Sequence, residues 1–302
     1  MEIERNKNEN EEEIKINERK YREHKIIDKA PIISSILLSI IGWFVLQCIL
    51  GFMIAFSSEI IEKPLNLNLE VTYAMMFIET VLVAFIGLIF YKRWFKSDFA
   101  GPIKYGKCRR AIVLVLAYAV YLMFNVTCIY LTYKSLKMPS MTMLLTALSA
   151  VVTEECAFRG FAVTTLMRNN TKENILIPVI VPAIVFGLIH VTNIFVGADP
   201  IFTVIQVFVT FGMGVALGGI YLLSGNILLP MVIHLIHDII GLSSGAYKDN
   251  CVFAGTAHWS SFIGLIPIGI LCAFFLYYLT RKKNKEAIIE MWNKKWSKDK
   301  VI

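Results

Sequence analysis

The stretch SMTMLLTALSAVVTEECAFRGFAVTTLM, residues 140–167, is almost entirely apolar, yet its middle carries Glu154, Glu155 and Arg159. A helix of roughly 20 apolar residues crosses the hydrocarbon core of a bilayer, and this run is long enough to do so. A charged side chain at the bilayer centre costs about 2.5–3.5 kcal/mol on insertion scales, so such groups normally face the protein interior and have a function. The stretch therefore predicts a membrane helix with a polar site inside the membrane.

The whole sequence has the composition of a membrane protein. Of its 302 residues, 56% are hydrophobic and 18% are charged, and the mean hydropathy is +0.62. One soluble domain does not need to bury so much apolar surface. Without the alternating pattern of a β-barrel, the sequence predicts an all-α, polytopic membrane bundle of about eight transmembrane helices. The expected spans are residues 32–56, 71–91, 111–133, 141–167, 175–195, 201–223, 227–243 and 259–279, the seventh being the shortest.

The distribution of positive charge predicts the orientation of the chain. Lysine and arginine are frequent before the first expected span and after the second, fourth and eighth, and they are scarce in the alternate loops. Because such residues favour the cytoplasmic side, we expect both termini in the cytoplasm, with the bundle in a bacterial plasma membrane. Attraction of this charge to anionic lipid headgroups accounts for the net charge of +7, so the bilayer is an expected partner and nucleic acid is not.

The composition divides the chain into three regions. Residues 1–30 are polar and highly charged and are predicted to be a disordered cytoplasmic tail. Residues 31–280 form the transmembrane domain, with its functional core at about 141–243. Residues 281–302 form a basic amphipathic tail in the cytoplasm, predicted to be either a short helix in the membrane interface or a frayed polar segment.

Small residues predict one close helix contact. Gly214 and Gly218 lie four residues apart in the sixth expected span. Small residues at this spacing let a neighbouring membrane helix approach closely. We interpret both glycines as packing residues.

The charged residues of the opening stretch differ in their local partners. Glu155 and Arg159 are four residues apart, so they share one face of a helix in the order that favours an ion pair. Glu154 is turned about 100° from Glu155 and has no partner of this kind. Glu154 therefore requires a partner from another helix.

Two other expected spans offer such partners. Residues 186–190 read FGLIH, with Phe186 and His190 four apart, and residues 234–238 read HLIHD, with His234 and Asp238 four apart. Each buried polar group would otherwise carry its own desolvation cost. We therefore predict that the polar sites of the three helices meet in one interior cavity.

The three motifs together carry a resemblance to a known family. E-E-x-x-x-R (154–159), F-x-x-x-H (186–190) and H-x-x-x-D (234–238), in this order on separate spans, resemble the CAAX protease and bacteriocin-processing family of intramembrane glutamic endopeptidases. The resemblance covers about residues 141–243. It implies hydrolysis of a peptide bond without a covalent enzyme intermediate and without a cofactor or metal ion. The implied partner is a peptide or protein substrate, with or without a lipid; no feature of the sequence indicates an oligomeric state.

The resemblance also implies catalytic roles. Glu154 would take a proton from the attacking water, and His190 would hold that water. His234 and Asp238 would lie near the carbonyl oxygen of the scissile bond and stabilise the oxyanion. The family often has asparagine where this chain has Asp238; an ionised aspartate only accepts hydrogen bonds, so orienting His234 or His237 is its alternative role.

The remaining motif residues are implied to support the site. Glu155 and Arg159 would brace the first motif, and Phe186 would either pack or face the substrate. His237, which no motif requires, is a core residue, a residue behind the site or a ligand.

Depth along each helix adds a condition. At about 1.5 Å per residue from the expected cytoplasmic ends, Glu154 and His190 lie about 21 and 24 Å deep, but His234 lies about 12 Å deep. The groups meet only if the seventh helix begins earlier and tilts, or if its expected boundary is wrong.

Three other functions use the same residue types. Glutamates and histidines also bind zinc that activates water, although the helical H-E-x-x-H signature is absent. Intramembrane Glu and His also suit a proton-coupled transporter. Glu79 of the second span would serve such a path, but we favour its other role, satisfying polar groups of a neighbouring helix. The third alternative is a non-catalytic immunity or scaffold protein. For a protease, the resemblance implies prenylated CAAX protein tails, bacteriocin precursors or peptide signals as substrates. Among these, the Lys-, Asn- and Ile-rich tails and the expected plasma-membrane topology favour bacterial peptide or bacteriocin processing, or self-immunity.

Overall fold

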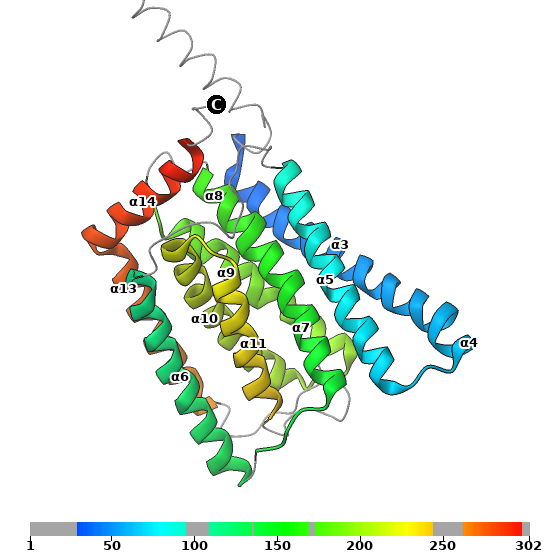
Figure 1. Ribbon diagram of the computed structural model, residues 1–302. Helices are drawn as coiled ribbons and strands as arrows, with labels where there is room; N and C mark the ends of the chain where they lie inside the picture. The colour runs from blue at the N-terminus through cyan, green and yellow to red at the C-terminus, as the bar shows by residue number, and fades with distance from the viewer. Residues whose placement is uncertain (1–28, 95–108, 135, 169–172, 244–261, 298–302) are drawn as a thin grey trace, which may run out of the picture.

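The computed structural model describes residues 29–94, 109–134, 136–168, 173–243 and 262–297 (Figure 1). Within these ranges the structure contains helices and no strand, which confirms the predicted all-α class. The elements are α3 (Pro31–Ser57), η1 (Ser58–Glu62), α4 (Lys63–Leu65), α5 (Leu69–Trp94), α6 (Arg109–Tyr133), α7 (Met141–Glu155), η2 (Cys156–Val163), α8 (Thr164–Arg168), α9 (Ile177–Ile189), η3 (His190–Val196), α10 (Pro200–Ser224), α11 (Leu228–Leu242), α13 (Leu265–Thr280) and α14 (Lys282–Ser297).

The lengths of these helices fit a polytopic membrane bundle. Six helical segments in the described ranges are long and apolar enough to cross a membrane: Pro31–Leu65, Leu69–Tyr91, Arg110–Thr132, Met141–Arg168, Ile177–Val196 and Pro200–Ser224. The seventh expected span is α11, whose 15 residues reach only about 22 Å. The eighth is α13, which is bent by 71° from α14; the two together would make a seventh span. The first residues of the eighth expected span, 259–261, lie outside the described part.

Helix α10 occupies the centre of the bundle. It contacts α6, α9, α11 and α13, while α3 and α5 stand at the opposite side from α6 and α13 in Figure 1. In the most apolar 18-residue stretch of each span, 61% of the α7–α8 span and 56% of α10 are buried inside the protein. The corresponding share is 17–22% for the spans that contain α3, α5 and α6. The central helices thus build the interior, and the apolar outer faces of the peripheral ones suit contact with lipid.

Glycine allows α9 and α10 to lie close together. A Cβ atom added at Gly214 would lie 2.9 Å from the Cα of Ala183, whereas at Gly218 the nearest atom, of Val179, would be 3.9 Å away. The predicted close packing is confirmed at Gly214, and Gly218 has room for a methyl group. Gly187 on α9 also lies close to α10, because a Cβ atom added at Gly187 would be 2.9 Å from the carbonyl oxygen of Val207.

The basic C-terminal region contains the helix α14, docked on the bundle. Ile288 and Trp292 are each 1% exposed. The Trp292 indole donates a hydrogen bond to the carbonyl oxygen of Leu222 (3.0 Å) and packs edge-on against Tyr221. The sequence predicted either a short helix in the membrane interface or a frayed polar segment. The structure has a helix, and its apolar face packs against the protein. The tail predicted at residues 1–30 lies almost wholly outside the described residues, as do residues 298–302.

The two glycines of α10 make a matched pair of substitutions. Gly214→Ala should destabilise the protein by about 1–3 kcal/mol, because the added methyl group meets the α9 backbone. Gly218→Ala should leave stability unchanged or slightly higher, since the methyl group fits and alanine favours helix. Thermal unfolding in detergent checks this. Equal unfolding temperatures for the two variants would contradict the packing described for α9 and α10.

Candidate active site

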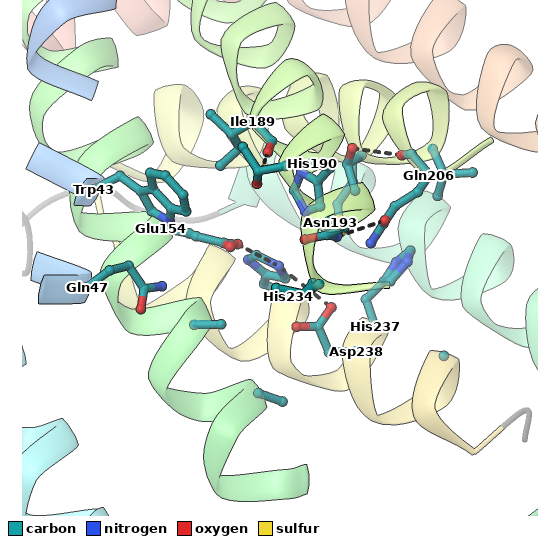
Figure 2. Close-up of a pocket in the computed structure, with 18 of the residues that line it drawn as sticks. Trp43, Gln47, Glu154, Ile189, His190, Asn193, Gln206, His234, His237 and Asp238 are labelled. Carbon is teal, nitrogen blue, oxygen red and sulfur yellow. Dashed lines mark hydrogen bonds and ion pairs between the residues drawn. The ribbon is translucent and has the colours of Figure 1, made fainter. Parts of the chain in front are cut away.

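One cavity of about 550 Å³ lies among α3, α7, η3, α10 and α11 (Figure 2). The residues predicted from the three motifs meet here, although they come from helices far apart in the sequence. Those lining the cavity are Glu154, His190, His234, His237 and Asp238. The other predicted residues, Glu155, Arg159 and Phe186, are buried behind its wall.

His234 links the acidic groups of the site. Its Nδ1 lies 2.8 Å from Oε1 of Glu155, and because a carboxylate only accepts hydrogen bonds, Nδ1 is the donor. Its Nε2 lies 3.7 Å from Oε2 of Glu154 and 3.7 Å from Oδ1 of Asp238. One side of the imidazole is thus fixed to α7, and the other faces the two carboxylates that line the cavity.

Glu155 and Arg159 form the predicted ion pair, with 2.9 Å between Oε1 and Nη1. They are 0% and 1% exposed. The guanidinium carbon lies 4.7 Å from the centroid of the Phe186 ring, a cation–π contact. Oε2 of Glu155 and Nη2 of Arg159 have no hydrogen-bond partner among the described residues. Each charge therefore depends on the other, because removing one partner leaves an uncompensated buried charge.

The helix changes geometry at this motif. Glu155 is the last residue of α7, and residues 156–163 form the π-helical segment η2. Just after this segment, the Thr164 hydroxyl donates to the carbonyl oxygen of Arg159, five residues earlier (3.3 Å). Such π-helical turns are frequent at functional sites.

Phe186 and His190 form the second wall of the site. Phe186 is fully buried, and its ring packs edge-on against His190 and His234, with centroid distances of 5.2 and 5.8 Å. Of its two predicted roles, this contact pattern is that of a packing residue. Nδ1 of His190 donates to the carbonyl oxygen of Phe186 (2.8 Å), so Nε2 of the neutral ring is a hydrogen-bond acceptor.

His237 and Glu79 have separate environments. His237 lines the cavity, and its Nδ1 lies 2.7 Å from the hydroxyl oxygen of Tyr118 on α6. Glu79, on α5, is buried but does not line the cavity. In the described part of the chain, no three His, Cys, Asp or Glu side chains are grouped closely enough to hold a metal ion.

The residues that line the cavity and were not predicted include Trp43 and Gln47 on α3, Asn193 on η3 and Gln206 on α10. The Gln47 amide donates to the hydroxyl of Thr153 (3.0 Å), next to Glu154. The Asn193 amide donates to Oε1 of Gln206 (2.9 Å). Like Glu154, these amides are polar groups on otherwise apolar helices, where a polar group usually faces the protein interior and has a function.

The buried ion pair predicts a double-mutant result. Arg159→Met should cost about 3–5 kcal/mol of stability, because it leaves the Glu155 carboxylate buried without its counter-charge. Adding Glu155→Gln should restore part of this loss, since it removes the uncompensated charge. Thermal unfolding of both variants in detergent measures the difference. If the double variant were no more stable than Arg159→Met, the two charges would not depend on each other.

Comparison with known proteins gives one match. Residues 135–240 match the family described as type II CAAX prenyl endopeptidase Rce1-like. None of the curated proteins and none of the solved structures matches the chain. The matched part runs from just before α7 into α11 and contains all three motifs. Over residues 135–240 the chain therefore carries an Rce1-like CAAX protease domain of the CAAX protease and bacteriocin-processing family.

Proposed function

We propose that this membrane protein is an intramembrane endopeptidase in which Glu154 activates water for attack on a peptide bond. The Rce1-like domain supports membrane endopeptidase activity. The observation that carries the glutamate mechanism is the convergence of Glu154, His190 and His234 on one cavity between membrane helices (Figure 2). A carboxylate and a histidine acceptor beside the same space provide two acceptors for the two hydrogens of one water.

In the first step, water donates one hydrogen bond to the Glu154 carboxylate and the other to Nε2 of His190. The commitment of Nδ1 to the Phe186 carbonyl keeps Nε2 available as an acceptor. The water oxygen attacks the scissile carbonyl carbon as Glu154 takes the proton. The same proton then passes to the departing nitrogen as the C–N bond breaks, which leaves one new carboxyl group and one new amine.

His234 is proposed to stabilise the oxyanion. In the doubly protonated ring, Nδ1 donates to Glu155 and Nε2 donates toward the cavity, where charge develops on the carbonyl oxygen. Asp238 lies 3.7 Å from this Nε2, a position that suits orienting the imidazole. We therefore assign Asp238 as a positioning residue for His234. Glu155 is proposed to position the same imidazole through its hydrogen bond to Nδ1, and Arg159 holds Glu155 in place.

The proposed setting is a bacterial plasma membrane, with both termini in the cytoplasm. The positive charges of the described helices support this orientation. Arg168 ends α8 and Lys282 begins α14; these two helices contact each other, at the end of the bundle where α3 begins (Figure 1). The proposed substrate is a membrane-associated or lipidated peptide or protein, cleaved in peptide or bacteriocin processing or in self-immunity.

Cleavage of a peptide library by the purified protein tests the mechanism. Glu154→Ala and His190→Ala should each lower the cleavage rate by about 100-fold or more, the usual contribution of a general base. Glu79→Ala, which removes a membrane-embedded glutamate outside the cavity, should keep the rate of the unchanged protein. The activity should persist in a strong chelator.

Three results would contradict this account. Loss of cleavage in chelator with recovery on adding zinc would establish a metalloprotease. Full cleavage by Glu154→Ala would remove the proposed base. No cleavage of any peptide by the folded protein would favour a transporter or a non-catalytic immunity protein.

A further inference from the structure

Two side-chain amides meet at the wall of the cavity, opposite Glu154 (Figure 2). Asn193 comes from η3 and Gln206 from α10, elements that contact each other. Asn193 is 8% exposed, and its Nδ2 donates to Oε1 of Gln206 at 2.9 Å. We call these two residues the amide pair.

The local helix geometry directs Asn193 to the cavity. The chain tightens from α9 into the 3₁₀ segment η3 at His190. In a 3₁₀ helix, side chains three residues apart are eclipsed. Asn193 therefore shares the face of His190, and both line the cavity.

The mutual bond uses only part of the hydrogen-bonding capacity of the amide pair. Oδ1 of Asn193 can accept and Nε2 of Gln206 can donate, and neither is bonded to another described residue. Both atoms are accessible from the cavity, because neither is among the buried side-chain atoms of the described residues that lack a hydrogen-bond partner. A molecule with polar groups that enters the cavity can therefore pair with both, whereas an apolar one would leave them unsatisfied, which is unfavourable.

A peptide main chain provides the complementary groups. Each residue of an extended peptide offers an N–H donor and a C=O acceptor, which match Oδ1 of Asn193 and Nε2 of Gln206. We propose that the amide pair binds the main chain of the substrate next to the scissile bond. Such contacts do not depend on the substrate's side chains. The proposal rests on the proposed endopeptidase function, and it makes the two amides positioning residues with no part in proton transfer.

Binding to a protein that cannot cleave tests the amide pair without relying on catalysis. The background is Glu154→Gln, and the probes are a pool of fluorescent peptides and the same pool with N-methylated backbones. Methylation removes the N–H donors that Oδ1 of Asn193 would accept. The Glu154→Gln protein should bind the parent pool about five- to tenfold more tightly than the methylated pool, the effect of about one hydrogen bond.

Two variants in this background separate the amide pair from its surroundings. Asn193→Leu, of similar size, should lower the preference to about twofold or less. Thr210→Val is the matched control, since Thr210 lines the same cavity one turn from Gln206 but its hydroxyl donates to the carbonyl oxygen of Gln206 within α10 (2.7 Å). This control should keep the full preference, and thermal unfolding confirms that both variants are folded.

The outcomes distinguish this inference from the endopeptidase proposal. If the preference for the parent pool over the methylated pool is lost in Asn193→Leu and kept in Thr210→Val, the amide pair is supported. If the protein with Glu154 intact also cleaves no peptide, only the endopeptidase proposal fails. A preference that survives Asn193→Leu, or no preference at all, overturns the amide pair. With Glu154 intact, Asn193→Leu should raise KM about five- to tenfold and leave kcat nearly unchanged; an equal loss in kcat alone would instead indicate a role in the chemical step.

Discussion

The buried contact between Arg159, Glu155 and His234 is the constraint on which the site depends. Inside a membrane bundle no water compensates an isolated charge, so Arg159 and Glu155 stabilise each other across 2.9 Å. The same Glu155 oxygen accepts a hydrogen bond from His234. This bond joins α11 to α7 and directs the other nitrogen of the imidazole toward Glu154 and Asp238. The first and third motifs thus act as one unit.

The packing of α9 on α10 places the second motif. Close approach at Gly214 accompanies the packing of Phe186 against Arg159 and His234, and His190 lies beside Phe186 one helical turn further along the chain. The Phe186 carbonyl oxygen in turn sets the donor and acceptor sides of His190. The change from α-helix to 3₁₀ helix at His190 then adds Asn193 to the same wall. Backbone packing in the centre of the bundle therefore determines which polar atoms face the cavity.

Much of this arrangement could be predicted from sequence because it depends on periodicity and on the cost of charge in lipid. Spacing predicted the Glu155–Arg159 pair, and the cost of burying polar groups in apolar helices predicted that the three motifs meet. Features set by tertiary contact were not predictable. Counting residues from the expected cytoplasmic helix ends placed His234 at a shallower depth than Glu154, but α11 packs against α7 and the two side chains lie 3.7 Å apart. The Asn193–Gln206 bond likewise depends on how η3 packs against α10. No spacing in the sequence indicated the π-helical turn of η2, and α11 is shorter than a full span.

The central claim is that Glu154 and His190 hold the attacking water while His234 faces the oxyanion. The most direct measurement is a high-resolution structure with a peptide ketone bound as its hydrate, whose two hydroxyl groups imitate the tetrahedral intermediate. One hydroxyl should lie within hydrogen-bond distance of both the Glu154 carboxylate and Nε2 of His190, and the other should face Nε2 of His234. A hydrate bound away from Glu154, or held by a metal ion between these side chains, would contradict the claim.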